Sequence, residues 1–169
     1  MKNTSGNKVF LLRILFFFAA CLVLLVMYVT CCLCSSYSFE SLLREESPAK
    51  IVHCSLDVCS SDNEFAITVD VDSEIFEGLF QVLQAEKYTK PLASVLGFTV
   101  SAYHIEAYPF YRILLQHEDN HRTEVIVNGT LLLIGSTTES GLTVYQISNG
   151  DSLLNGLNSF FNSFPGINC

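Results

Sequence analysis

A run of five residues, HEDNH at positions 117–121, has the residue types and spacing for metal chemistry. It fits the H-E-x-x-H motif, in which two histidines on one helical face bind Zn²⁺ and the glutamate activates water. Asp119 and Asn120 favour turns, however, and β-type sequence stands on both sides, at 111–115 and 123–127. We therefore expect an acidic hairpin tip at this position, without a metal ion.

Other patterns of catalytic chemistry are weak in this chain. His53 stands beside Cys54, but two adjacent residues need further ligands before they indicate a metal site. His104 lies in a strand-like run and is expected to be structural. The sequence contains no G-x-S-x-G nucleophile motif and no glycine-rich phosphate-binding loop. We expect no cofactor and no enzymatic activity.

An apolar segment near the amino terminus dominates the composition, which is 50% hydrophobic with a mean hydropathy of +0.38. Residues Ile14 to Cys34 carry no charge over 21 positions. At about 1.5 Å per residue this segment spans a hydrocarbon core of about 30 Å. It exceeds the apolar region of about 7 to 15 residues in a cleaved signal peptide. A retained transmembrane signal anchor is favoured over a cleaved signal or a lipoprotein signal ending at Cys21.

Basic residues predict the orientation of this segment. Lys2, Lys8 and Arg13 precede it, and the next basic residue is Arg44. Lysine and arginine beside a span stay on the cytosolic side. We expect a cytosolic tail at 1–13, a transmembrane helix at 14–34, and a type II protein of the plasma membrane whose ectodomain is extracellular, with shedding left open.

The ectodomain is strongly acidic. Of the 9 basic and 17 acidic residues, the first 34 positions hold three basic and no acidic ones, which leaves 6 basic and 17 acidic, a net charge of −11. Nucleic acid and anionic lipid surfaces would be repelled by this charge. The composition therefore excludes nucleic acid as a partner and leaves lipid contact to the transmembrane helix.

Two modifications are predicted for a secretory-pathway domain. Cys54 and Cys59 are close enough in sequence to close a small disulfide loop, and Cys169 then stays free or pairs with another chain. Asn128-Gly129-Thr130 is an N-glycosylation sequon on the lumenal side of the expected topology.

Short apolar runs separated by turn residues indicate a mostly β ectodomain at 64–169, after an irregular stalk or lead-in at 35–63. Two other stretches have apolar residues at helical spacing. The first, 75–83, follows Asp72 or Ser73 as a possible N-cap. The second, 153–164, is rich in asparagine, glycine and serine, so strand and turn are favoured there. An α+β domain is the alternative fold. The expected strands are 65–71, 97–105, 110–115, 123–134 and 142–147.

The layout of a short tail, one span, a stalk and a β-type domain is similar to that of the tumour necrosis factor ligand family. LTVYQISNGDSL at 142–153 resembles a late strand and Gly-Asp turn of that family, and PFYRILL at 109–115 resembles a middle strand. FFNSFPGINC at 160–169 takes the place of the closing strand, and 97–100 or 78–80 that of the glycine-aromatic strand. Tryptophan is absent and Pro165 interrupts the closing strand, which departs from the family's pattern.

This resemblance implies an antiparallel jelly-roll sandwich and a homotrimer. It implies a cytokine-like membrane ligand that binds a cysteine-rich cell-surface receptor, with a role in immune responses. The receptor-contact loop would be the hairpin tip, His117, Glu118, Asp119, Asn120, His121 and Arg122. The alternative is a non-catalytic viral or host membrane glycoprotein of another family, acting as an adhesion or immune-modulating module.

Overall fold

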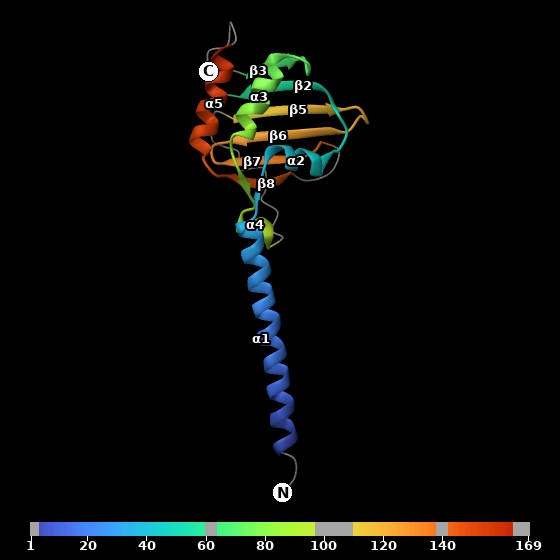
Figure 1. The fold of residues 1–169 in the computed structure, drawn as a ribbon, viewed down its shortest axis with the longest axis vertical. Helices are drawn as coiled ribbons and strands as arrows, with labels where there is room; N and C mark the ends of the chain where they lie inside the picture. Colours follow the sequence, from blue (N-terminus) through green and yellow to red (C-terminus); the bar gives the residue numbers. More distant parts are fainter. Residues whose placement is uncertain (1–3, 60–63, 97–109, 138–141, 164–169) are drawn as a thin grey trace.

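The computed structural model describes residues 4–59, 64–96, 110–137 and 142–163. Five helices and eight strands are formed within these ranges (Figure 1). The helices are α1 (Thr4–Cys34), α2 (Phe39–Glu46), α3 (Glu74–Gln84), α4 (Leu92–Val95) and α5 (Gly150–Asn162). The strands are β1 (Ser36–Tyr37), β2 (Ile51–Cys59), β3 (Glu64–Val69), β4 (Tyr88–Thr89), β5 (Phe110–His117), β6 (Arg122–Asn128), β7 (Leu131–Ser136) and β8 (Thr143–Ile147).

Helix α1 contains the apolar segment predicted from the sequence. Its window Leu12–Cys34 has 23 residues, a mean hydropathy of 2.7 and no part buried against the rest of the protein. The helix extends away from the folded domain, beyond the sheet edge at which β1, β4 and β8 lie (Figure 1). The chain therefore has one N-terminal helix among the described residues that is long and apolar enough to be a membrane anchor or a signal sequence.

All eight strands belong to one antiparallel sheet, in the order β1-β4-β8-β7-β6-β5-β2-β3. The strands expected at 65–71, 110–115 and 142–147 are confirmed as β3, β5 and β8. The run 123–134 divides into two strands because Gly129 has a φ of 56° and starts a two-residue hairpin turn. The strand expected at 97–105 lies outside the described residues.

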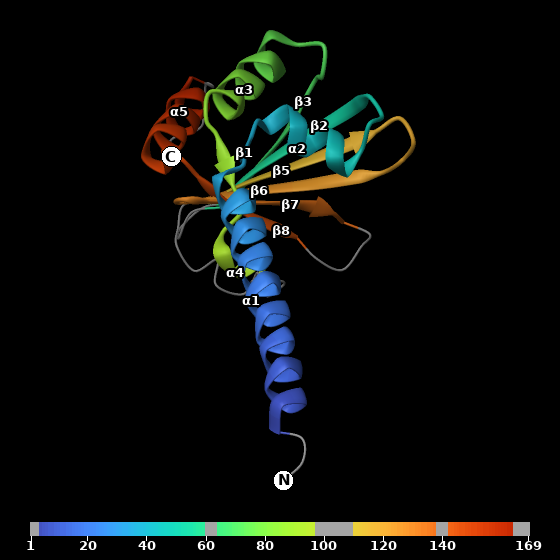
Figure 2. The same cartoon turned by 60° about the horizontal axis from the view of Figure 1, so that its bottom comes forward.

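Three helices cover one face of this sheet, here called the helical face (Figure 2). The jelly-roll sandwich is not confirmed, since the described strands form one sheet with α2, α3 and α5 packed on it instead of two facing sheets. The α+β alternative describes this architecture. Nine core side chains come from these helices: Phe39, Leu42, Leu43, Phe76, Leu79, Leu83, Leu153, Leu157 and Phe161.

Helix α3 forms where its apolar spacing predicted a helix. The Ser73 side chain caps it by accepting a hydrogen bond from the Phe76 N–H at 3.2 Å. Leu79 and Leu83, one turn apart, are fully buried in the core. Helix α5 packs close to Gly78, since a Cβ atom there would lie 3.4 Å from the Phe160 ring, an ordinary van der Waals contact that does not require a glycine.

The prediction of strand and turn at 153–164 is wrong, since residues 150–162 form α5. Its buried residues Leu153, Leu157 and Phe161 recur every four positions and face the core. A Cβ atom on Gly156 would lie 2.9 Å from a Val82 methyl, so the glycine that weakens the isolated helix brings α5 close to α3. Burial of the apolar stripe outweighs the poor intrinsic helix propensity of the intervening residues.

The stalk predicted at 35–63 is also wrong for the part that the structure describes. Residues 51–59 form β2, which pairs with both β3 and β5 inside the sheet. Cys54, Leu56 and Val58 alternate onto the helical face and are buried. The period-two pattern in this segment was the signal for a strand, although the neighbouring charged and proline residues indicated a lead-in.

The disulfide predicted between Cys54 and Cys59 is not formed. Cys54 is a free, buried cysteine, and both residues belong to the single strand β2. Five steps of about 3.3 Å along a strand exceed the Cα separation of about 4.4 to 6.8 Å that a disulfide requires. Burial raises the pKa of the Cys54 thiol to about 12, so the thiol stays protonated and unreactive at neutral pH.

Thiol counting tests the state of Cys54. The number of thiols that react with a chromogenic disulfide reagent at pH 8, without reductant, is expected to be equal in the native wild-type chain and in Cys54→Ser. In denaturant the wild type should show one more reactive thiol than Cys54→Ser. A gain of one thiol in native Cys54→Ser would instead show that Cys54 normally pairs with another cysteine and would contradict the structure.

Gly150 is expected to be required where α5 begins. A Cβ atom there would lie 2.8 Å from the Gly129 carbonyl oxygen and 2.9 Å from the Thr130 Cα, both in the β6–β7 turn. Gly150→Ala should lower the free energy of unfolding by about 1–3 kcal/mol, as overpacking does. Exposed Asn155→Ala in the same helix is the control and should cost nothing. Urea unfolding followed by tyrosine fluorescence measures both, and an unchanged midpoint for Gly150→Ala would refute the close contact.

Candidate functional site

The hairpin tip predicted at 117–122 is confirmed. The loop between β5 and β6 closes with the His117 N–H donating to the His121 carbonyl at 2.9 Å. Asn120 adopts a left-handed φ of 64°, and the Asp119 carboxylate accepts the His121 N–H at 3.0 Å. The residues are not helical, so they lack the one-sided arrangement that the zinc-protease motif requires. Among the described residues, no three His, Cys, Asp or Glu side chains are grouped to hold a metal ion.

His117 has a structural role, and its burial argues against the predicted receptor contact at this residue. Its side chain is only 1% exposed and faces the helical side of the sheet. The ring Nδ1 lies 3.0 Å from the Ala49 carbonyl oxygen and the Nε2 lies 2.9 Å from the Thr123 hydroxyl. Because a carbonyl only accepts, Nδ1 carries the hydrogen and Nε2 accepts from Thr123. The ring thus joins the segment before β2 to the β5–β6 hairpin.

The remaining residues of the tip differ in exposure. Glu118, Asp119, Asn120 and Arg122 are exposed, and the receptor contact expected of them stays a prediction. His121 is half-buried, and its Nε2 atom is buried without a hydrogen-bond partner in the described ranges. Only Arg122 extends from the tip into a cavity.

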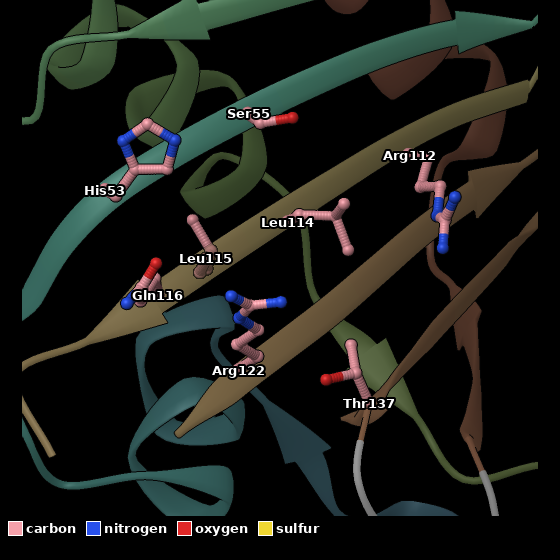
Figure 3. A pocket seen from close by; sticks show the side chains of 8 residues that line it. All are labelled: His53, Ser55, Arg112, Leu114, Leu115, Gln116, Arg122 and Thr137. Atoms are coloured by element: carbon pink, nitrogen blue, oxygen red, sulfur yellow. The ribbon is translucent and has the colours of Figure 1, made fainter. Parts of the chain in front are cut away.

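That cavity is a pocket of about 430 Å³ on the face of the sheet opposite the helices, here called the opposite face. It lies over β2, β5 and β6, close to the hairpin tip, and Figure 3 shows its side chains. Two arginines, one histidine and three uncharged polar residues contribute to it, with apolar contacts from two leucines. The lining residues are His53, Ser55, Arg112, Leu114, Leu115, Gln116, Arg122 and Thr137.

Strand register brings these residues together from distant parts of the chain. Gln116 of β5 is opposite His53 of β2 on one side and Arg122 of β6 on the other. The Thr137 N–H, just after β7, donates to the Arg122 carbonyl at 3.0 Å and continues the row. Leu114 lies two positions from Gln116 and so points to the same face. This register gives a polar row of four side chains across four adjacent segments of the sheet.

The two arginines of the pocket differ in their partners. The Arg112 Nε lies 2.6 Å from Glu124 Oε1, and its Nη1 lies 3.9 Å from Asp57 Oδ2. These carboxylates are only 16% exposed, so screening by water is reduced and Arg112 is held in place. Arg122 has no carboxylate partner in the part of the chain that the structure describes. Figure 3 shows its guanidinium group turned from β6 toward β5.

The far end of the opposite face is apolar. Ile126, Leu133 and Val144 form a small cluster, with Phe110 and Leu142 packed against it. The cluster begins in the row Asp57-Arg112-Ile126-Leu133, and the row Ser55-Leu114-Glu124-Gly135 lies between it and the polar row. A group with a polar end and an apolar body therefore has complementary surface on this face, next to Leu114.

Sequence reasoning missed most of this pocket. Of its residues only Arg122 was predicted as a site residue, and His53 was set aside as a two-residue coincidence. The available signal was alternation, since Arg112 and Gln116 both fall on the half-buried positions that alternate with the buried ones along β5. Alternation alone does not say which strands are neighbours, so it could not have assembled the row.

Asn128, the predicted glycosylation site, ends β6 beside the turn at Gly129. Its side chain is only 9% exposed, while a glycan is bulky and requires a surface position. Glycosylation of Asn128 stays a prediction, and the burial of the amide argues against it.

Comparison of the chain with protein-family models, curated proteins and solved structures found no match. Function is therefore argued from the geometry of the chain itself.

His117→Ala should destabilise the domain, because it leaves the Ala49 carbonyl and the Thr123 hydroxyl without their buried partner. Each unsatisfied group costs about 1–3 kcal/mol. Exposed Glu118→Ala, the neighbouring residue, should stay within about 0.5 kcal/mol of the wild type. Urea unfolding of the full chain in detergent provides the comparison. Equal midpoints for the two variants would show that the His117 bonds contribute nothing to stability.

Proposed function

We propose that this chain is a membrane-anchored, non-catalytic binding protein whose domain binds a ligand in the pocket on the opposite face. The observation that carries the proposal is the polar row at that pocket, on the face of the sheet opposite α2, α3 and α5. Concave sites with a few convergent polar groups are the usual form of a ligand site, and about 430 Å³ lies within their size range.

The anchor is the second part of the proposal. Helix α1 is apolar on all sides, and a helix of this kind is stable in lipid but not as a solvent-exposed element. Lys2, Lys8 and Arg13 precede the uncharged run from Ile14 to Cys34, which favours a cytosolic amino terminus and an extracellular domain at the plasma membrane. The domain would then display the pocket outside the cell.

Of the two functions predicted from the sequence, the geometry favours the alternative. The expectations of a trimer and of a cysteine-rich receptor came from the resemblance to the tumour necrosis factor ligand family. Both expectations depend on a sandwich of two sheets. A single sheet covered by helices gives that reading no support. The proposal is therefore an adhesion or immune-modulating module of another family, with a protein or small molecule as ligand.

Translation of the full chain into microsomal vesicles tests the anchor. The domain should be protected from added protease, the product should keep its full length, and it should resist alkaline extraction. Leu24→Arg with Leu25→Arg should prevent insertion, because each arginine at the helix centre costs about 2.5–3.5 kcal/mol. Leu24→Ala with Leu25→Ala is the matched control. A product shortened by the length of a signal peptide, or a protease-sensitive domain, would contradict the proposal.

A further inference from the structure

The ion pairs of the domain distinguish one of its three arginines from the other two. Residues 35–169 carry 17 acidic side chains and only 6 basic ones, so carboxylates are in large excess. Arg44 pairs with Glu40 at 2.9 Å, and Arg112 pairs with Glu124 at 2.6 Å. Arg122 alone of these three arginines has no carboxylate partner within the ranges that the structure describes.

The surroundings of Arg122 suit an anionic group better than a cation. Gln116 lies directly opposite on β5, and Thr137 adjoins it after β7. Both side chains line the same pocket and offer hydrogen-bond donors, as does Ser55 from β2. Glu124, two positions along β6 on the same face as Arg122, is already bound to Arg112. A ligand anion at Arg122 would therefore meet hydrogen-bond donors. The Glu124 carboxylate would not compete with it, because Arg112 already holds that carboxylate.

The apolar part of the pocket restricts which organic group can be attached to the anionic group of the ligand. Leu114 stands between Arg112 and Gln116 on β5. Its side chain contributes an apolar surface to the pocket that the Arg122 guanidinium group also lines (Figure 3). A fully hydrated inorganic ion would leave this surface exposed to water, whereas a short aliphatic chain would cover it. The fixed fork of a guanidinium group matches the two oxygens of a carboxylate.

We infer that the pocket binds a small organic carboxylate, with Arg122 gripping the two carboxylate oxygens, Gln116 and Thr137 donating at its sides, and Leu114 packing against the ligand's apolar body. This inference rests on the proposed binding function of the pocket and names its ligand class. Arg112 does not bind the ligand in this arrangement. Its ion pairs with Glu124 and Asp57 hold the pocket wall and keep those carboxylates away from Arg122.

The test is a titration of the full chain in lipid nanodiscs, followed by NMR of the pocket resonances, with butyrate as the probe. Butyramide and butylamine have the same chain length without the carboxylate. Butyrate is expected to give saturable shifts at pocket residues, with affinity at least about tenfold above that of butyramide. Arg122→Gln should weaken butyrate binding by about tenfold or more, and Arg122→Lys should restore only part of the affinity, since lysine lacks the fork.

Arg44→Gln is the matched control, because it removes the same charge from an exposed arginine outside the pocket. It should leave butyrate binding unchanged. Equal affinities in the wild type and Arg122→Gln, or an equal loss in Arg44→Gln, would overturn the assignment of Arg122. Shifts with butylamine or butyramide but not with butyrate would overturn the carboxylate class while the binding function stands. If none of the three probes shifts the pocket resonances of the folded chain, the binding function fails as well.

Discussion

The fold depends on burial of one face of a single sheet beneath three amphipathic helices. Leu79, Leu157 and Phe39, from three different helices, are fully buried in one core with the alternate residues of the strands. The core excludes water from one side of every long strand, and a one-residue slip would move those side chains to the wrong face. Strand register, and with it the other side of the sheet, is set by this requirement.

The opposite face follows from that register. Because the buried residues occupy every second position, Arg112, Gln116 and Arg122 must point away from the helices. Antiparallel pairing then aligns them with residues of β2 and with the end of β7. The pocket is thus a consequence of core packing, and its geometry is as stable as the sheet that carries it. Sites held by strands are more rigid than sites built on loops alone.

The hairpin tip shows how one short segment serves both faces. His117 turns inward and joins the β5–β6 hairpin to the segment before β2, while Arg122 turns outward into the pocket. A change at His117 would therefore disturb the strand that positions Arg122, even though the histidine touches no ligand.

Local sequence determined the features that depend on neighbouring residues alone. The uncharged run before Cys34, the strands with clear alternation, the helix behind Ser73 and the turn at Asp119 and Asn120 could all be predicted, since length, periodicity and turn chemistry act over a few residues. Only the tertiary structure decided the helix at 150–162, because burial of its apolar stripe offsets the unfavourable propensity of its asparagines and glycines.

The pocket and the single sheet likewise required the tertiary structure. Strand residues carry period two in many sheet arrangements, so the pattern does not state whether one sheet or two will form, or which strands will be neighbours. His53 and Arg122 face the same pocket only because β5 pairs with both of their strands. Non-local pairing chooses among arrangements that satisfy the same local pattern. For that physical reason the sequence by itself determined the elements with a clear local pattern and the apolar N-terminal segment, and the packed domain decided the site.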